Sequence, residues 1–186
     1  NQPVVGVSWF EARAYCNWLA AHSGLPIRLP TEAETEAATR GQEGRLFAHG
    51  DRFDAMSCNC VETHLRQPSP VGVFPSGATP EGAEDLTGNV FEWTSSAYAR
   101  APYEPLFAYP YRPDDGREEA DTDLSILRVC RGGSWAYGEE YARASLRFTT
   151  SPASRVSACG FRVARNAASQ DVFSAGGDVG RAQALF

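Results

Sequence analysis

The chain has 186 residues, of which 42% are hydrophobic and 11% aromatic, enough to fill the core of one domain. Its net charge of −6 argues against a nucleic-acid partner held mainly by phosphate contacts, and all 17 basic residues are arginine. No apolar run approaches the roughly 20 residues of a membrane span, and no secretory signal opens the chain.

The first predicted elements are a short strand at residues 3–7 and a helix that follows it. Ser8 and Glu11 have the spacing of a capping box, in which each side chain bonds to the other residue's backbone amide. Gly24 ends the helix. One face carries apolar residues at helical spacing, which we assign to the core: Trp9, Ala12, Cys16 and Leu19.

A second helix is predicted to run from its cap, Thr31, to Arg40, with Glu34 completing another capping box. The helix is unusually polar, so we expect it to lie on a flat surface through its small residues, Ala33, Ala37 and Ala38. Residues 42–80 are predicted to be mostly loop, with one short strand at residues 71–74.

Residues 85–93 favour a turn that feeds a strand. Within them, the Asn89 side chain, the Val90 carbonyl and the Glu92 side chain offer hard oxygen ligands, which alone are a weak signal for calcium. Residues 97–123 are rich in proline, tyrosine and acidic side chains and are predicted to be a solvated loop. A strand is predicted to follow at residues 124–129.

Gly132 and Gly133 suit a sharp turn or a close backbone crossing, because glycine readily adopts positive φ. Residues 161–164 alternate apolar and polar side chains, which predicts a short strand. Between these points, residues 136–158 have small, hydroxyl and aromatic side chains with arginines at intervals. We expect an exposed irregular segment on a fixed frame, where binding residues tend to lie.

The early helices and later short strands indicate an α+β fold, with two helices packed on small antiparallel sheets and many loops. The five cysteines have irregular spacing, which favours buried free thiols over a disulfide framework. Unpaired cysteines and the lack of a signal peptide favour a cytoplasmic location.

Five phrases resemble those of one family, in order and at similar spacing: Gly6-Val7-Ser8-Trp9, Arg28 to Glu34, Gly88 to Thr94, Arg131 to Trp135 and Gly160-Phe161-Arg162. The chain resembles the formylglycine-generating-enzyme (sulfatase-modifying factor) family, whose fold is a variant of the C-type lectin fold. The resemblance implies a domain at residues 1–165 and a C-terminal tail at 166–186. Whether a further segment precedes residue 1 in the protein stays an open question.

The resemblance offers three branches: copper enzymes that make formylglycine, iron-dependent sulfoxide synthases, and ligand-binding proteins diversified by retroelements. The copper branch uses two cysteines shortly after the Gly-Gly-Ser motif, where this chain has none between Cys130 and Cys159. The iron branch needs three histidines, and those present are far apart in sequence: His22, His49 and His64. We therefore expect no copper and no iron.

The third branch varies the segment between the Gly-Gly-Ser-Trp and Gly-Phe-Arg motifs, through codons that exclude Glu, Gln, Lys, Met and Trp. Related sequences keep fixed residues at Arg143, Arg147, Pro152 and Arg155, whereas Glu139 and Glu140 break the codon rule. The compatible residues form our predicted ligand-binding set: Ala136, Tyr137, Gly138, Tyr141, Phe148, Thr149, Thr150, Ser151, Val156, Ser157 and Ala158.

The family often binds calcium through its Gly-Asn-x-x-Glu-Trp segment, so the resemblance implies a structural calcium site at Asn89, the Val90 carbonyl and Glu92.

We predict a non-catalytic ligand-binding protein, a retroelement-diversified variable protein that binds a protein or glycan. Exposed Tyr137, Tyr141 and Phe148 would supply rigid contact area. The alternative is an oxidoreductase domain of the formylglycine-generating or sulfoxide-synthase type. An ordinary pseudo-enzyme of the same fold and a scaffold domain in a larger complex also remain open.

Overall fold

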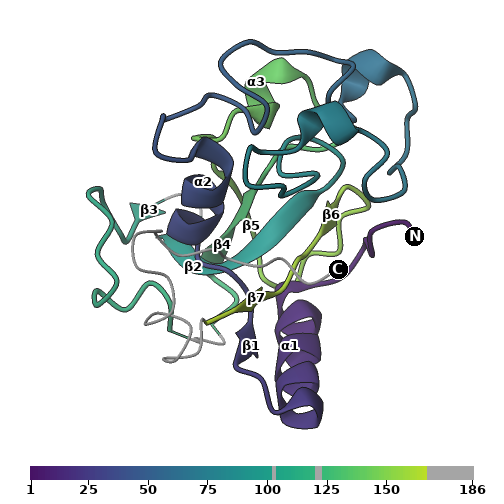
Figure 1. The fold of residues 1–186 in the computed structure, drawn as a ribbon. Helices are drawn as coiled ribbons and strands as arrows, with labels where there is room; N and C mark the ends of the chain where they lie inside the picture. The colour runs from purple at the N-terminus through teal and green to yellow at the C-terminus, as the bar shows by residue number, and fades with distance from the viewer. Residues whose placement is uncertain (102–103, 120–122, 167–186) are drawn as a thin grey trace, which may run out of the picture.

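We describe the protein from a computed structural model, which places residues 1–101, 104–119 and 123–166. The fold is α+β, as predicted. It has a central curled sheet, with helix α2 against it and helix α1 at one end of the molecule (Figure 1). The helices are α1 (Trp9–Ser23), α2 (Glu32–Arg40) and α3 (Glu139–Ala142), with 3-10 turns η1 (Val61–Thr63) and η2 (Pro75–Gly77). The strands are β1 (Ile27–Arg28), β2 (Phe91–Arg100), β3 (Glu104–Pro105), β4 (Ile126–Arg131), β5 (Phe148–Thr150), β6 (Cys159–Gly160) and β7 (Ala164–Arg165).

The main sheet has the strand order β3-β2-β4-β5, and all of these neighbours are antiparallel. Strand β6 joins it by pairing in parallel with the start of β2. The short strands β1 and β7 form a separate two-stranded sheet beside α1 (Figure 1). Within the described residues, no helix is long and apolar enough to cross a membrane.

Helix α1 begins and ends where the sequence predicts. The Ser8 amide donates to Glu11 Oε2 over 2.8 Å, the Glu11 amide donates to Ser8 Oγ over 3.3 Å, and Gly24 is left-handed. The strand predicted at residues 3–7 is wrong. Gly6 has a φ of +69°, and its amide is shared between the Val156 carbonyl and the Cys159 carbonyl at the start of β6, so residues 3–7 form no regular strand.

Helix α2 has the predicted cap at Thr31 and lies against the sheet, but it packs through a different face. The alanines are half-buried or exposed, and the buried residues are Glu32, Thr35 and Thr39. The prediction of an alanine contact is wrong because the polar side of the helix is the buried one. The carboxylate of Glu32 has two guanidinium partners, Arg117 and Arg147, from the chain that precedes β4 and β5.

Three other local predictions differ from the structure. Residues 71–74 form a turn and not a strand, because Gly72 has a φ of +78° and η2 starts at the next proline. The strand predicted at 161–164 is mostly absent. Residues 161–163 are irregular chain between β6 and β7, and Ala164 begins β7. The region 97–123 contains the end of β2 and buried Arg117, so its described part is more than a solvated loop.

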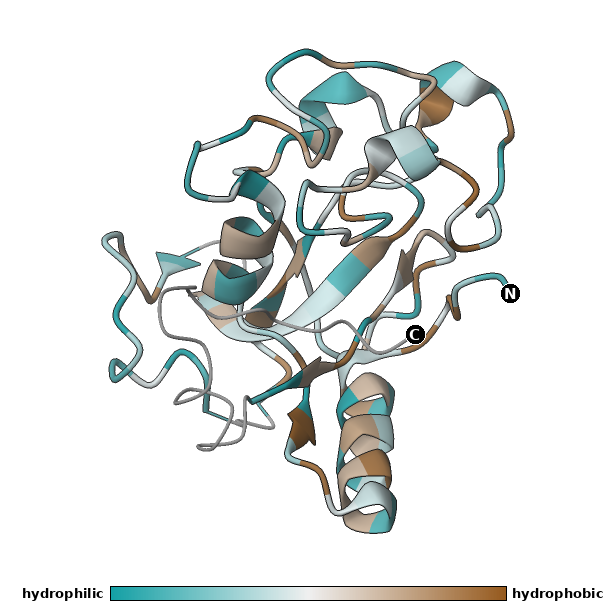
Figure 2. Ribbon diagram, viewed as in Figure 1, coloured by the Kyte–Doolittle hydropathy of each residue, from teal (hydrophilic) through white to brown (hydrophobic). Residues whose placement is uncertain are grey.

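The core lies between α1 and the sheet. Figure 2 shows apolar residues on β1 and along α1, both of which contribute to it. Trp9 and Trp93 are its largest members, and each indole N–H donates to a backbone carbonyl, of Thr94 and Val7 respectively. The Trp9 bond fixes α1 to β2, and the Trp93 bond fixes β2 to the chain just before α1. Aromatic residues of the segment after β4 pack on the same core.

Candidate ligand-binding face

Two glycines start the segment that links β4 to β6. Gly133 has a φ of +78°, and a Cβ there would lie 2.8 Å from the Ala142 Cα and 2.9 Å from the Tyr141 carbonyl oxygen. A glycine is therefore required, because the backbone of the segment folds back across this point. The predicted close crossing is present.

Backbone hydrogen bonds hold the segment to loops far away in sequence. The Trp135 amide donates to the Asn89 carbonyl over 2.8 Å, and the Ala144 amide donates to the Leu46 carbonyl over 2.8 Å. The Val61 amide donates to the Tyr137 carbonyl over 3.0 Å. The segment has turn hydrogen bonds of its own, such as that from the Tyr141 amide to the Gly138 carbonyl, and these three bonds fasten it to its surroundings.

The three predicted aromatic residues form one cluster on buried Phe91. Phe148 stacks on Phe91 with centroids 4.6 Å apart, and Tyr137 meets the Phe91 ring edge-on at 5.4 Å. Tyr141 lies 4.6 Å from Tyr137. All three are half-buried and not fully exposed as predicted, because part of each ring packs on the core.

The smaller predicted residues divide between two surroundings. Ala136 and Ser157 are exposed, and Gly138, Thr149, Thr150 and Ser151 are half-buried. Residues from Thr150 onwards lie near the start of α1, where the Trp9 amide donates to the Pro152 carbonyl over 3.0 Å. The set is therefore not one uniform patch, and the aromatic cluster is its best-defined part.

Two members of the predicted set point toward the core. Ala158 is only 3% exposed, because its carbonyl accepts from the Phe91 amide where β6 meets β2. Its side chain cannot contact a ligand, so its inclusion is wrong. Val156 packs on the main core while remaining half-buried.

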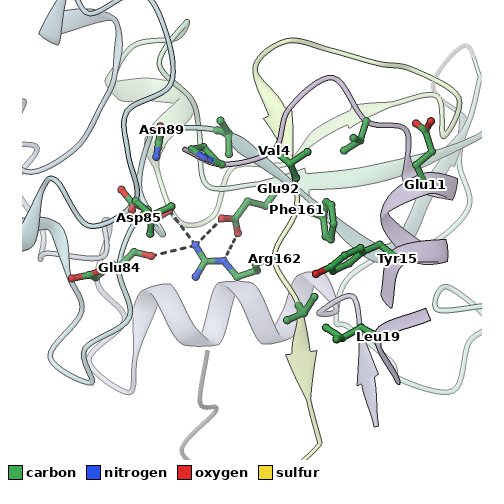
Figure 3. Close-up of a pocket in the computed structure, with 15 residues that line it drawn as sticks. Val4, Glu11, Tyr15, Leu19, Glu84, Asp85, Asn89, Glu92, Phe161 and Arg162 are labelled. Carbon is green, nitrogen blue, oxygen red and sulfur yellow. Dashed lines mark hydrogen bonds and ion pairs between the residues drawn. The ribbon is translucent and has the colours of Figure 1, made fainter. Parts of the chain in front are cut away.

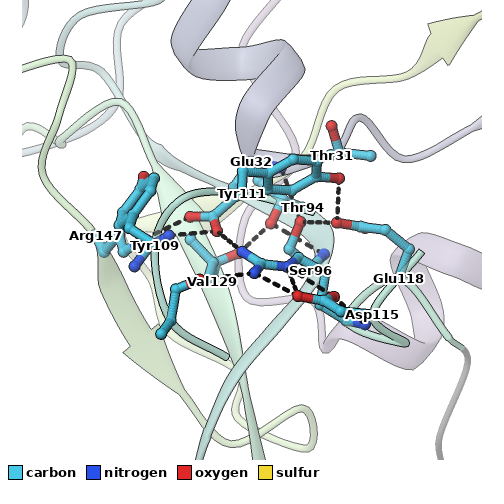
Figure 4. A network of polar contacts seen from close by, with 12 residues as sticks. Thr31, Glu32, Thr94, Ser96, Tyr109, Tyr111, Asp115, Glu118, Val129 and Arg147 are labelled. Atoms are coloured by element: carbon cyan, nitrogen blue, oxygen red, sulfur yellow. Dashed lines mark hydrogen bonds and ion pairs between the residues drawn. The ribbon is translucent and has the colours of Figure 1, made fainter. Parts of the chain in front are cut away.

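The arginines of the segment tie it to the frame. Arg147 donates from Nε and Nη2 to the two Glu32 oxygens, each over 2.6 Å, and its guanidinium lies 4.2 Å from the Tyr109 ring centroid (Figure 4). Arg131 pairs with Glu36 of α2 and donates to the Leu146 carbonyl. These contacts hold both ends of the first half of the segment to α2.

A third arginine ties the second half to α1. Arg155 Nε and Nη2 donate to the Glu11 carboxylate over 3.0 and 2.9 Å. These bonds, together with those from Ser8, lower the pKa of Glu11 to about 2. Glu11 is thus both the second half of the α1 capping box and an anchor for this segment.

Replacing Arg155 with glutamine is expected to lower the melting temperature at neutral pH more than at acidic pH. Because the Glu11 pKa is depressed on folding, its stabilising effect is present above its ordinary value of 4.5 and is lost as pH falls toward about 2. Thermal melts of both proteins between pH 7 and 2 test this. A gap that stays constant with pH would contradict it.

Acidic residues surround Gly138 beside the aromatic cluster. The Glu139 amide donates to Glu62 Oε1 over 3.1 Å, and a Cβ on Gly138 would lie 3.0 Å from both Glu62 Oε1 and Glu140 Oε2. Glu139 and Glu140 occupy the first turn of α3, where the helix dipole favours acids. Glu62 comes from a loop with no sequence signal, and we did not predict it.

The predicted calcium ligands do not fit calcium in this arrangement. The Asn89 side chain accepts from the Ser69 amide over 3.0 Å and donates to the Ser69 carbonyl, so its oxygen is already used. Both Glu92 oxygens accept from Arg162, over 2.5 and 2.6 Å. Calcium binding here stays a prediction.

Four of the five thiols lie in two close pairs, of which only Cys58 and Cys60 are neighbours in sequence. The Cys58 and Cys60 sulfurs are 3.4 Å apart, and those of Cys130 and Cys159 are 3.6 Å apart. All are buried, and burial raises the pKa of Cys130. Buried thiols of raised pKa are poor nucleophiles and poor metal ligands at neutral pH.

The three histidines lie in separate places, with His22 on α1, His49 against Phe47 and His64 after η1. Among the residues that the structure places, no three His, Cys, Asp or Glu side chains are arranged to hold a metal.

Comparisons with known proteins match nearly the whole described chain. Residues 1–167 match the model of the sulfatase-modifying factor enzyme 1-like domain. The chain is 34% identical to hercynine oxygenase of Mycolicibacterium thermoresistibile over 171 residues, which are 88% of this chain and 36% of that protein. It is also 34% identical to the inactive C-alpha-formylglycine-generating enzyme 2 of Bos taurus, over 89% of this chain and 50% of that one.

A similar solved structure is that of Treponema denticola variable protein 1. It superposes with a TM-score of 0.70 at 25% identity, over 87% of this chain and 70% of that one. The chain spans about a third to a half of the two curated relatives, so their whole activities do not transfer directly.

Proposed function

The chain belongs to the family of sulfatase-modifying factor enzyme 1-like domains, and on that premise we propose that it is a non-catalytic ligand-binding protein. The observation that carries this proposal is the cluster of Tyr137, Tyr141 and Phe148, gathered on one base by a segment whose arginines are bound to both helices. Rigid aromatic contact area on a fixed frame is what a binding face needs. A protein or a glycan would be the ligand.

The arrangement also supports diversification of this segment by a retroelement. Arg147 and Arg155 bind the frame through ion pairs, whereas the side chains of Ala136 and Ser157 are exposed and those of Tyr137, Tyr141 and Phe148 are half-buried. Substitution at these positions would then change which ligand is bound, while the arginines keep the segment in place. Its likeness to a variable protein favours the same reading.

Sibling genes test this part of the proposal. We expect sequence differences among them to concentrate at Ala136, Tyr137, Gly138, Tyr141 and Phe148, and to spare the frame arginines. Differences spread evenly along the chain would contradict diversification without touching the binding proposal.

Replacing Tyr141 with alanine is expected to weaken binding of a ligand found on a protein or glycan array by about 10-fold or more, because buried tyrosine contacts often act as hot spots. Its control is Trp18→Ala, which removes an exposed aromatic residue of α1 that lies outside the segment. Binding would be measured by biolayer interferometry, with melting temperatures to check folding. Equal binding by the wild type and the Tyr141 variant would contradict this placement of the face.

The alternative is an oxidoreductase domain, and the identity to hercynine oxygenase favours it. Its test is oxygen consumption with a thiol substrate and added iron or copper. Turnover under these conditions would replace the binding proposal.

A further inference from the structure

A groove separates α1 from the middle of the molecule, on a surface distinct from residues 136–158. Its volume is about 520 Å³, and it is lined by α1, residues 3–7 and the chain between β6 and β7 (Figure 3). No residue of the proposed ligand face contributes to its lining. Its size is in the range of sites that take a ligand or a few side chains of a partner.

One end of the groove is apolar and aromatic. The Tyr15 ring contacts that of Phe161 edge-on, with centroids 5.5 Å apart, and lies 5.6 Å from the Trp18 ring on the next turn of α1. Tyr15 is still 46% exposed and Trp18 52% exposed, so two adjacent aromatic side chains present apolar surface to solvent. Val4, also on the groove wall, is 49% exposed.

The other end is acidic. Three carboxylates line it, from Glu84, Asp85 and Glu92, against one guanidinium, from Arg162 (Figure 3). Arg162 is bound to both Glu92 oxygens and to the Glu84 and Asp85 carbonyls. The Asp85 carboxylate accepts from the Gly72 amide, and within the described residues no hydrogen bond or ion pair engages the Glu84 carboxylate. This end therefore has an excess of negative charge.

We propose that this groove binds an apolar polypeptide segment of a partner protein that carries lysine or arginine beside its apolar residues. The apolar residues would cover Tyr15, Phe161 and Val4, and the cation would face Glu84 and Asp85. The exposed faces of Tyr15 and Trp18 suit a cation as well, since aromatic rings attract ammonium and guanidinium groups.

Charge selects this occupant over others. A second copy of this chain has a net charge of −6 and no lysine, so it would bring further negative charge to the acidic end. An anionic lipid headgroup or a nucleic acid would be repelled there in the same way. The cations of a basic partner are attracted by the carboxylates at one end of the groove and by the aromatic rings at the other.

The test uses the full chain and a fluorescein-labelled ten-residue peptide of alternating leucine and lysine. A peptide with glutamate in place of lysine is its comparison, and anisotropy titrations would be run in low salt. We expect the lysine peptide to bind at least about 10-fold more tightly than the glutamate peptide. Equal affinity of the two peptides would overturn the proposal.

Substitutions in the groove locate the binding. Glu84→Gln with Asp85→Asn is expected to weaken the lysine peptide about 5-fold or more, and Tyr15→Ser by a similar factor. The matched control is Glu104→Gln with Asp114→Asn, which removes two exposed acids outside the groove. Melting temperatures identify unfolded variants. If the control weakens binding as much as the groove variants do, the peptide binds by net charge alone and the proposal fails.

Two further measurements distinguish other occupants. A chain shortened to residues 1–166 that binds the lysine peptide far more tightly than the full chain would assign the groove to residues 167–186. Dimerisation that is abolished by Tyr15→Ser in light scattering would assign it to a second copy. Either result overturns a basic partner, and neither affects the proposed function of residues 136–158.

Discussion

Replacing Glu32 with alanine is expected to lower the free energy of unfolding by about 3–5 kcal/mol. Its carboxylate is 2% exposed and lies between Arg147, bound over 2.6 Å, and Arg117, at 3.4 Å and 1% exposed (Figure 4). Without it, a buried guanidinium loses a charge partner in a site that water cannot easily reach. Arg117 keeps Asp115, whereas Arg147, among the residues that the structure places, keeps its contacts with the Tyr98 and Tyr109 rings and no carboxylate.

Urea unfolding followed by tryptophan fluorescence would measure this change. Arg100→Ala is the control, because Arg100 pairs with Asp123 and the two side chains are 45% and 40% exposed. Exposed pairs contribute about 1 kcal/mol or less. A loss for Glu32→Ala no larger than that of the control would mean that the network contributes little to stability.

Replacing Gly133 with alanine is expected to destabilise the fold by about 2–4 kcal/mol, the second large effect. The added Cβ would meet backbone atoms of Tyr141 and Ala142 at under 3 Å, and backbone cannot move aside as a flexible side chain can. The residue would also be held at a φ of +78°, which alanine adopts with strain.

Gly82→Ala separates these two contributions. Gly82 has a similar φ of +87°, but a Cβ there would meet nothing within 4 Å. Its loss should therefore be about 1 kcal/mol, from strain alone. Chemical unfolding of both variants gives the difference between them. Equal losses would show that the crossing at Gly133 relaxes without cost.

The sequence predicted the elements that depend on local chemistry. Both long helices start at their capping boxes, because the Ser8–Glu11 and Thr31–Glu34 pairs act over only three residues. The strands were harder to predict. Residues 3–7 and 71–74 have strand-like composition, yet Gly6 and Gly72 at positive φ keep them irregular.

The packing of α2 could not be predicted because it depends on residues distant in sequence. Glu32 is buried since Arg117 and Arg147, 85 and 115 residues later, arrive at the same point. A polar helix face normally indicates solvent. Here it indicates an ionic contact, which only the tertiary structure shows.

The candidate face was predicted in part. The aromatic residues were identified by type, and their convergence follows from Phe91, a strand residue with no signal of its own. Glu62 was missed because nothing in its loop marks it as a neighbour of Gly138. Ala158 was included because codon compatibility does not consider burial.

The buried cysteines also give the protein built-in reporters of local opening. Cys16 lies on α1, Cys58 and Cys60 in the long loop, and Cys130 and Cys159 beside β2, and none is exposed. A thiol reagent therefore modifies only molecules in which one of these regions has opened. Labelling rates, read peptide by peptide in a mass spectrometer, would rank the helix, the loop and the sheet by the free energy of their separate openings, without any added probe.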